Sequence, residues 1–436
     1  MKVLVLGSGG REHAIMWALK HTSGKPLELF CAPGNGGIAD LGQCVSIDPA
    51  DDSQLLEFVE FEGIDLTIVG PEAPLAAGIV DRFQTHRRPI IGPTRAAARL
   101  ESSKAFAKEF MARHGIPTAR FRIAETPSQA IEILRRGVFG EPDEPVVVKA
   151  DGLAAGKGVV MAASRAAAEV AVIELMSGRL VSTDAARSVV IEEALKGREA
   201  SVLIFADRQD YALMPAARDH KRIGEGDTGP NTGGMGAVTD DQILDHDMRQ
   251  RIGQEIVAPT LAGAVAEGLP YQGVLFIGLM LTAQGPKVLE YNVRFGDPET
   301  QAILVRLQTD LLEIFQAIRH GNLSRTAIEW TNESSACVVL ASRGYPGAYE
   351  KGAVISGLSN VESLTNVQVF HAGTRLSVPG EFLTDGGRVL GVTATGQNLE
   401  QALARSYGAV KMISWKGMQY RRDIGKFPGA RGVSKT

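Results

Sequence analysis

Short apolar runs separated by amphipathic stretches fill the first hundred residues. The chain opens with the continuously apolar run 2–6, which a glycine ends, and further runs follow at 27–31, 65–69 and 89–92. The segment after the first run carries apolar residues at helical spacing. Continuous apolar strands alternating with amphipathic helices are typical of a parallel sheet covered on both faces. The pattern predicts an α/β domain with a doubly wound sheet.

The rest of the chain is predicted to be α+β. A helix is expected over 100–114, and a compact insert over about 120–190 with helices near 127–136 and 164–176 and a strand at 146–149. Strands at 189–193, 201–205, 273–281 and 287–294 are expected to form a mostly antiparallel sheet, followed by a helix near 298–319. Strands at 336–341 and 386–392 and a helix over 398–413 complete the chain. We therefore expect three domains, at 1–103, 104–324 and 325–436.

Composition narrows the class of protein. The 436 residues include 46 basic and 50 acidic side chains, a net charge of −4 that argues against a nucleic-acid binder or a membrane-surface protein. No apolar stretch approaches the length of a membrane span, and no signal-peptide pattern is present. The three cysteines are widely spaced, which predicts reduced thiols in a cytoplasmic protein.

Two turns of the first domain follow predicted strands. Gly9 and Gly10 belong to the first turn, where backbone N–H groups and a helix N-terminus favour a phosphate. A dinucleotide site would need glycine where Glu12 stands, so a complete NAD site is not expected. Glu72, after a later strand, is a candidate for holding sugar hydroxyls. The alternative for both is a turn without a ligand.

A glycine-rich stretch follows the buried strand that Lys149 ends. Gly156, Lys157 and Gly158 lie within it, but the spacing is not that of a P-loop. Backbone donors and a mobile lysine suit polyphosphate, whereas the alternative is a solvated hairpin tip. The segment 192–199 joins two strands. Its backbone is a candidate for reading adenine, and Glu199 for holding ribose, although charged turns are common.

The most informative segment is residues 289–299. Strand alternation places Glu290, Asn292 and Arg294 on one face. A carboxylate and an amide oxygen suit a hard cation such as Mg²⁺ that also takes phosphate oxygens, and an arginine beside them suits a transferring phosphoryl group. The alternative is the polar outer face of a strand. The glycine-rich loop 229–236 is expected to wrap a small ligand closely.

At these residues the chain resembles the glycinamide ribonucleotide synthetases, also called phosphoribosylamine–glycine ligases, of the ATP-grasp superfamily. The motifs that carry the resemblance span the chain: GSGGREHA at 7–14, GPE at 70–72, KADGLAAGKGV at 149–159, DHKR at 219–222, GPNTGGMG at 229–236, RFGDPETQ at 294–301, HAGT at 371–374 and GGRVL at 386–390. The resemblance implies a preATP-grasp domain, an ATP-grasp unit whose mobile lid is the insert at about 120–190, and a small C-terminal α+β domain.

The resemblance also implies the reaction. ATP phosphorylates glycine, and the amine of 5-phosphoribosylamine then displaces phosphate, giving glycinamide ribonucleotide, ADP and phosphate in purine biosynthesis. Mg²⁺ or Mn²⁺ is held by Glu290 and Asn292. Phosphates and adenosine are held by Lys104, Lys149, Gly156, Lys157, Gly158, Glu192, Glu193, Leu195 and Glu199. Arg294 stabilises the transferred phosphoryl group. Asp297, Gly233, Gly234 and Gly236 are the candidates for holding glycine, with Asp297 pairing its ammonium, and Gly9, Gly10 and Glu72 are the candidates for holding the ribosylamine. Asp219 is a further candidate for binding a substrate. A monomer is expected.

Three other functions are consistent with parts of the sequence. The first glycine-rich turn is compatible with a nicotinamide-dependent oxidoreductase, although Glu12 argues against that function. A nucleotide-binding regulator without catalytic activity is a second alternative, although the intact set of Glu290, Asn292 and Arg294 argues against it. A ligase for a different carboxylate and amine, such as a dipeptide ligase, would share the ATP-grasp motifs.

Overall fold

The first domain is a parallel sheet, as predicted. The computed structural model describes residues 1–154 and 157–427. Its five-stranded sheet has the order β3-β2-β1-β4-β5, and every pairing is parallel. The strands are β1 (Lys2–Gly7), β2 (Glu28–Pro33), β3 (Gln43–Cys44), β4 (Leu66–Val69) and β5 (Ile90–Ile91), with helices α1 (Gly10–Thr22), α2 (Asp52–Glu62), α3 (Glu72–Ala77) and α4 (Ile79–Thr85). The strand order reverses between β1 and β4, which is the point where such sheets bind ligands.

The helix expected over 100–114 is two helices. Helix α5 (Arg95–Ser102) ends before Ser103, and α6 (Lys104–Arg113) starts directly after it. The Ser103 hydroxyl accepts a hydrogen bond from the Phe106 N–H and so caps the second helix. A serine at this place both ends one helix and begins another, which the apolar periodicity does not reveal.

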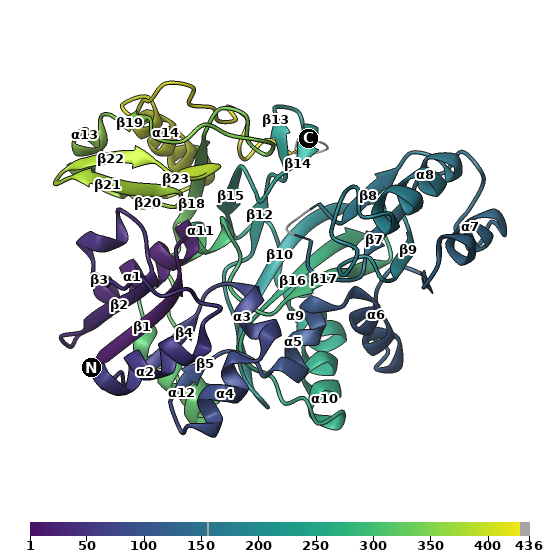
Figure 1. The fold of residues 1–436 in the computed structure, drawn as a ribbon, viewed down its shortest axis with the longest axis horizontal. Helices are drawn as coiled ribbons and strands as arrows, with labels where there is room; N and C mark the ends of the chain where they lie inside the picture. Colours follow the sequence, from purple (N-terminus) through teal and green to yellow (C-terminus); the bar gives the residue numbers. More distant parts are fainter. Residues whose placement is uncertain (155–156, 428–436) are drawn as a thin grey trace.

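The predicted insert is a separate lobe that projects to the right in Figure 1. It contains β6 (Phe121–Ala124), α7 (Pro127–Arg135), β7 (Val146–Ala150), β8 (Val159–Ala162), α8 (Arg165–Met176) and β9 (Val189–Glu193). Its four strands form an antiparallel sheet in the order β6-β9-β7-β8, and its apolar side chains form a core of their own. The strand at 189–193 was expected in the large antiparallel sheet and instead belongs to this lobe.

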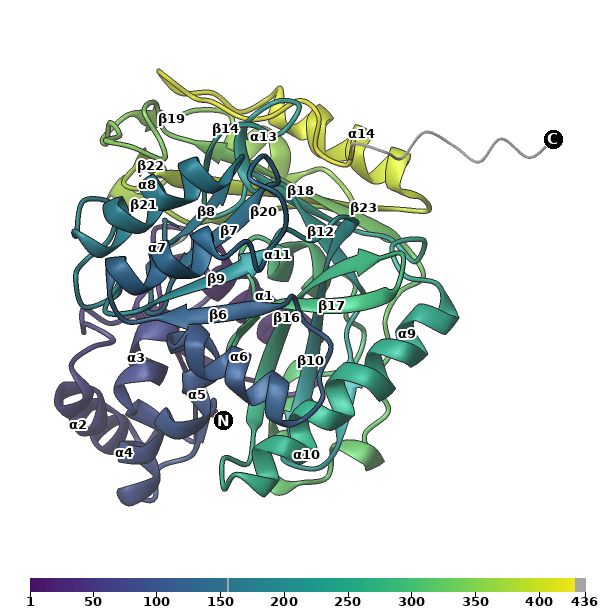
Figure 2. The ribbon, with the colours of Figure 1, turned by 90° about the vertical axis from the view of Figure 1, so that its right-hand side faces the viewer.

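A nine-stranded antiparallel sheet forms the centre of the molecule. Its order is β17-β16-β10-β12-β15-β18-β23-β20, and β11 pairs with β10. These strands are β10 (Arg198–Asp207), β11 (Tyr211–Leu213), β12 (Ala217–Asp219), β15 (Gly236–Thr239), β16 (Gln272–Thr282), β17 (Gly285–Asn292), β18 (Ser334–Ala341), β20 (Val367–His371) and β23 (Arg388–Gly396). The sheet therefore continues from the middle of the chain into its C-terminal part. Figure 2 shows the lobe in front of β10, β16 and β17.

The remaining helices pack on or around this sheet, and the remaining strands form two small sheets. These elements are the hairpin β13 (Arg222–Gly224) and β14 (Thr228–Asn231), helices α9 (His246–Ile252), α10 (Ala258–Ala266), α11 (Glu299–Leu304), α12 (Leu311–His320), α13 (Leu358–Glu362) and α14 (Leu399–Val410), and the small sheet of β19 (Val354–Ile355), β22 (Glu381–Thr384) and β21 (Thr374–Val378). The single helix expected near 298–319 is α11 and α12, because Asp310 caps a new helix. Across the residues that the structure describes, no helix combines the length and apolarity needed to cross a bilayer.

Candidate active site

Glu290 and Asn292 lie on one face of β17. Between and beyond them, Tyr291 and Val293 are buried in the core, as the alternation predicted. Glu290 lies opposite Gly278 on β16, where a Cβ would come within 3.2 Å of the Glu290 Cγ. The missing side chain leaves room for the carboxylate. A carboxylate and an amide oxygen on neighbouring outward positions are the donors that a hard cation prefers.

A cation on β17 would need ligands beyond Glu290 and Asn292. Among the described residues, no group of three or more His, Cys, Asp or Glu side chains could hold a metal ion. An ion at Glu290 and Asn292 would therefore take its other ligands from phosphate oxygens and water, as Mg²⁺ commonly does. The donor set on β17 fits that kind of ion. The Asn292 Oδ1 also accepts a hydrogen bond of 3.3 Å from the Arg294 Nη2.

Two lysines from different elements approach this strand. Lys149, near the end of β7, is 5% exposed, and its Nζ donates to the Leu289 carbonyl at 3.0 Å. Lys104 is the first residue of α6, and its Nζ donates to the Gly152 carbonyl at 3.3 Å. Burial lowers the pKa of Lys104, and the charge of Glu290 partly opposes this. The structure thus brings both predicted phosphate lysines beside the predicted cation ligands.

The segment predicted to hold adenosine has its acidic side chains engaged within the protein. The Glu192 carboxylate is 1% exposed and lies 3.0 Å from the Lys149 Nζ and 3.1 Å from the Lys108 Nζ. Glu193 accepts hydrogen bonds from the backbone N–H and the Nε of Arg120. The Glu192 side chain is therefore directed at two lysines instead of a ribose. The Glu193 backbone N–H also donates within the protein, to the Arg120 carbonyl.

Lys108 contacts Glu192 in this site and was not predicted from the sequence. It is 2% exposed, and its Nζ also donates to the Thr118 hydroxyl at 2.6 Å. Burial lowers its pKa to about 8, although Glu192 opposes the shift. A lysine in the middle of an amphipathic helix carries no sequence signal for this role, because its partner comes from a distant strand.

Glu199 and Asp219 share one lysine. The Lys221 Nζ lies 3.0 Å from the Glu199 Oε2 and 3.0 Å from the Asp219 Oδ1. The charge of Lys221 lowers the pKa of Glu199. Glu199, predicted to hold ribose, and Asp219, predicted to bind a substrate, therefore both contact Lys221.

The glycine-rich stretch of the lid is described in part. Gly156 lies outside the described residues. Lys157 is exposed, and Gly158 is buried where a Cβ would come within 2.7 Å of the Ala154 Cβ. This close approach requires glycine at position 158, whether or not a phosphate binds there.

Arg294 lies just beyond β17 and is held by two carboxylates. Its Nε is 3.2 Å from the Glu72 Oε2, and its Nη2 is 3.0 Å from the Glu101 Oε1. Burial opposes the charge of Arg294, but Glu101 and Glu72 outweigh it and raise the pKa. Burial likewise opposes ionisation of Glu72, but Arg294 and Arg11 lower its pKa. Glu101 was not predicted, since a glutamate near a helix end gives no sign of this partner.

Glu12 occupies the first glycine-rich turn. Its Oε2 accepts a hydrogen bond of 2.6 Å from the Gly9 N–H, and its Oε1 lies 2.6 Å from the Arg11 Nε. A Cβ at Gly70 would collide with the same carboxylate. The residue that departs from the dinucleotide pattern therefore joins the turns after β1 and β4.

The first turn also reaches the middle of the chain. A Cβ at Gly9 would lie 3.4 Å from the Asp297 Oδ2, and a Cβ at Gly10 would lie 2.5 Å from the Gln301 Nε2. Asp297 and Gln301 are themselves joined by a hydrogen bond of 2.7 Å. Gly9 thus lies beside Asp297, the carboxylate predicted to bind glycine, and Gly10 lies beside Gln301, which donates to that carboxylate.

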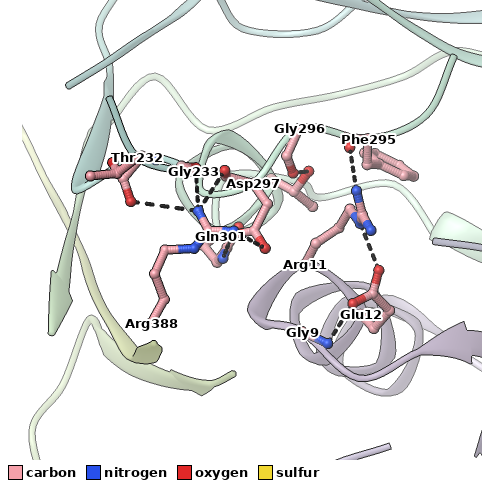
Figure 3. A network of polar contacts seen from close by, with 12 residues as sticks. Gly9, Arg11, Glu12, Thr232, Gly233, Phe295, Gly296, Asp297, Gln301 and Arg388 are labelled. Carbon is pink, nitrogen blue, oxygen red and sulfur yellow. Dashed lines mark hydrogen bonds and ion pairs between the residues drawn. The ribbon is translucent and has the colours of Figure 1, made fainter. Parts of the chain in front are cut away.

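Asp297 lies in a polar network to which three domains contribute (Figure 3). The Arg388 Nη2 is 3.0 Å from its Oδ2, and the Arg388 Nη1 donates to the carbonyls of Asp297 and Gly233. Gly234 has a φ of +107° and packs against Pro298. Burial opposes the charge of Arg388, but Asp297 outweighs it and raises the pKa. The GGRVL motif contained Arg388, but the sequence did not indicate its partner.

Gly236 is placed differently from the other glycines of its loop. It is the first residue of β15 and is buried, and a Cβ there would come within 2.7 Å of the Cys337 carbonyl. The close packing of two strands accounts for this glycine. Its predicted contact with substrate does not follow from its position.

The comparisons with known proteins identify the family. Three models described as Phosphoribosylglycinamide synthetase match the chain: the N domain at residues 1–101, the ATP-grasp (A) domain at 102–300 and the C domain at 335–427. The phosphoribosylamine–glycine ligase of Xylella fastidiosa (strain Temecula1) is 47% identical, covering 98% of this chain and 97% of its own. That of Chlorobaculum tepidum is 49% identical, covering 98% and 99%.

Solved structures of known proteins are similar to this chain over nearly its whole length. The crystal structure of the phosphoribosylamine–glycine ligase of Thermotoga maritima is similar with a TM-score of 0.83 and 34% identity, covering 97% of this chain and 100% of that chain. The biotin carboxylase domain of the Hydrogenobacter thermophilus 2-oxoglutarate carboxylase shares the fold, with a TM-score of 0.69 and 15% identity over 96% of this chain and 91% of that chain.

These findings confirm the predicted resemblance, fold and function, and they favour this ligase over the oxidoreductase, the inactive regulator and the ligase for other substrates. Enzymes of the ATP-grasp fold use ATP together with divalent metal ions. The chain belongs to the phosphoribosylglycinamide synthetase family, whose members are the ATP-dependent ligases that join glycine to phosphoribosylamine.

Proposed function

We propose that this ligase binds ATP between the lid and β17, with Glu290 and Asn292 as the protein ligands of a divalent cation. The observation that carries the proposal is that Lys149 donates to the Leu289 carbonyl on that strand while the charge of Glu290 acts on the buried Lys104. The bound cation, Mg²⁺ or Mn²⁺, would supply positive charge to the phosphate oxygens. Lys104, Lys149 and the exposed Lys157 add further positive charge around the triphosphate.

The reaction proceeds in two steps. A carboxylate oxygen of glycine attacks the γ-phosphorus of ATP, ADP leaves, and glycyl phosphate forms. The amine of 5-phosphoribosylamine then attacks the glycyl carbonyl carbon, phosphate leaves, and the amine loses a proton as the amide of glycinamide ribonucleotide forms. Both steps depend on bringing anions together, so positioning and charge carry the rate. Arg294 supports the transferred phosphoryl group.

The two other substrates would meet at the junction of the three domains. Asp297 pairs with the glycine ammonium, and the Gly233–Gly234 backbone encloses it. Gly9 and Gly10 lie at the N-terminus of α1, and Glu72 lies at the start of α3. Both helices start at the sheet position where the strand order reverses, which supports a site there for the ribosylamine phosphate and sugar.

The variant Glu290→Ala tests this arrangement. Removal of one cation ligand is expected to lower kcat by at least about a hundredfold, because positive charge is lost where phosphoryl transfer occurs. Glu313→Ala is the matched control, because Glu313 is exposed on α12. Glycine-dependent ADP formation in the presence of 5-phosphoribosylamine measures the effect. A kcat for Glu290→Ala equal to that of Glu313→Ala contradicts the proposal.

We also propose domain boundaries at 103/104 and 324/325, with residues 120–190 as a lid, and a monomer that works in the cytoplasm. The family models, which change at residues 101/102 and restart at 335, support the boundaries. The free thiols of Cys31, Cys44 and Cys337 are compatible with a reducing compartment. Light scattering of the purified protein tests the monomer.

A further inference from the structure

Two motifs of the C-terminal part have no place in the mechanism above, although Arg388 of one contacts Asp297 and Ala372 of the other lies beside Gly10. The HAGT motif at 371–374 joins β20 to β21, and the GGRVL motif at 386–390 leads into β23. The backbones of Gly373 and Gly386 touch, so a Cβ at either would collide with the other. A Cβ at Gly387 would collide with the ring of Tyr345. These glycines allow the close packing from which the Arg388 side chain extends.

Arg388 reaches out of its own domain. Its guanidinium contacts the Asp297 carboxylate at 3.0 Å, the Asp297 carbonyl at 2.8 Å and the carbonyls of Gly233 and Gly234. A Cβ at Gly233 would lie 3.0 Å from the Arg388 Cζ, so the loop lies directly against the guanidinium. The Tyr345 hydroxyl accepts a hydrogen bond from the Gly233 N–H at 2.9 Å. Two side chains from one domain thus fix a loop of another.

The Asp297 carboxylate is held from both sides. Gln301, which is 2% exposed, donates to the Oδ1, whereas Arg388 approaches the Oδ2. The Gln301 Oε1 is buried without a hydrogen-bond partner in the described part of the chain. A carboxylate with one partner on each oxygen keeps lone pairs for a further donor and has a fixed orientation. Figure 3 shows both partners around Asp297.

We propose that Arg388 is a positioning residue for the amino-acid substrate: from the C-terminal domain, it holds the Asp297 carboxylate and the Gly233–Gly234 loop in place, so that Asp297 is oriented to receive the glycine ammonium. This inference rests on the proposed glycine site. It gives the C-terminal domain a part in recognising glycine, because Arg388 contacts both the Asp297 carboxylate and the loop. Within the ATP-grasp domain, Gln301 supports the carboxylate and the Thr232 hydroxyl supports the loop by separate hydrogen bonds. A planar guanidinium reaches several acceptors at once, which an ammonium cannot do.

The test is Arg388→Lys, with Arg375→Lys as the matched control. Arg375 is exposed on β21 of the same domain. Arg388→Lys is expected to raise the KM for glycine about tenfold or more, while the KM for ATP stays within about twofold, because the misplaced groups would contact glycine and not ATP. Arg375→Lys should match the wild type. A wild-type glycine KM in Arg388→Lys overturns the proposal, as does an equal rise in both KM values.

A second variant separates positioning from folding. Arg388→Ala should lose glycine affinity and regain it when guanidinium ions are added, whereas a fold that depends on Arg388 would show a lowered Tm and no rescue of the glycine KM. Absence of rescue in a variant with a wild-type Tm overturns the proposal. If Arg388→Ala does not fold, the Arg388→Lys result decides alone.

Asp297→Asn distinguishes the two levels of inference. A raised glycine KM in Asp297→Asn with a wild-type value in Arg388→Lys would overturn only the role of Arg388. A wild-type glycine KM in Asp297→Asn would instead overturn the proposed glycine site itself.

Discussion

Arg294 shows how far a single residue can be interpreted from sequence. Its position two residues after Asn292 predicts that it shares a face with the cation ligands, and the Arg294 Nη2 does donate to the Asn292 Oδ1. What the sequence could not predict is that Glu72 and Glu101, from two other elements, hold the same guanidinium. Such partners depend on tertiary packing and leave no local pattern. The same is true of Lys108 and Arg388.

Arg294→Lys is expected to lower kcat roughly a hundredfold and to change the KM for ATP far less, because a lysine keeps the charge but cannot contact both carboxylates and a phosphoryl group at once. Steady-state kinetics of ADP formation measure both constants. Arg251→Lys is the control, since Arg251 pairs with Glu255 in a partly exposed position on α9. A rise in the KM for ATP with kcat unchanged would assign Arg294 to ground-state binding of ATP.

At the scale of elements, apolar periodicity predicts that a helix or strand exists better than it predicts where that element begins and ends. The parallel strands, α7, α8 and α14 lie close to their predicted positions, because each has a clear apolar pattern. The helices expected at 100–114 and 298–319 each divide in two, because Ser103 and Asp310 start new helices within apolar periodicity. The strand at 189–193 has a buried-strand pattern that fits either sheet, so its membership could not be predicted.

Ser103→Ala is expected to lower the free energy of unfolding by about 1 kcal/mol, because the cap of α6 is lost. The Ser103 hydroxyl also donates to the Asp151 Oδ1 at 2.9 Å, so the variant loses a link between α6 and the lid. Urea titration measures the change. Ser128→Ala, at an exposed position inside α7, is expected to change stability by less than about 0.5 kcal/mol. Equal effects of the two substitutions would exclude a capping role.

At the scale of the whole molecule, the first and last domains meet at two buried histidines. The His13 Nδ1 on α1 accepts a hydrogen bond of 2.9 Å from the backbone N–H of His371 on β20. Burial, and next the charge that His371 would carry, lower the pKa of His13 to about 3, and burial lowers the pKa of His371 to about 4. This contact links the first domain directly to the last domain. Sequence motifs place both residues, but their contact spans most of the chain.

Acid is therefore expected to weaken the interface. Because the folded-state pKa of His13 lies below its ordinary value of 6.5, its stabilisation is complete above that pH and is lost as pH falls toward 3. The loss amounts to about 2 kcal/mol between about pH 7 and pH 5. His13→Asn keeps an acceptor without titrating and should lose less stability over this range in urea titrations. Exposed His246→Asn is the control, and parallel pH profiles of His13→Asn and the wild type would contradict the expectation.

The role of β17 as the cation-binding strand is tested most directly by the binding of Mn²⁺ to the enzyme in the presence of ADP, followed by electron paramagnetic resonance. Glu290→Ala is expected to weaken this binding by at least about tenfold, because a carboxylate ligand is removed, while Glu313→Ala binds as the wild type. Unchanged Mn²⁺ affinity in Glu290→Ala would contradict the assignment of the cation to this strand.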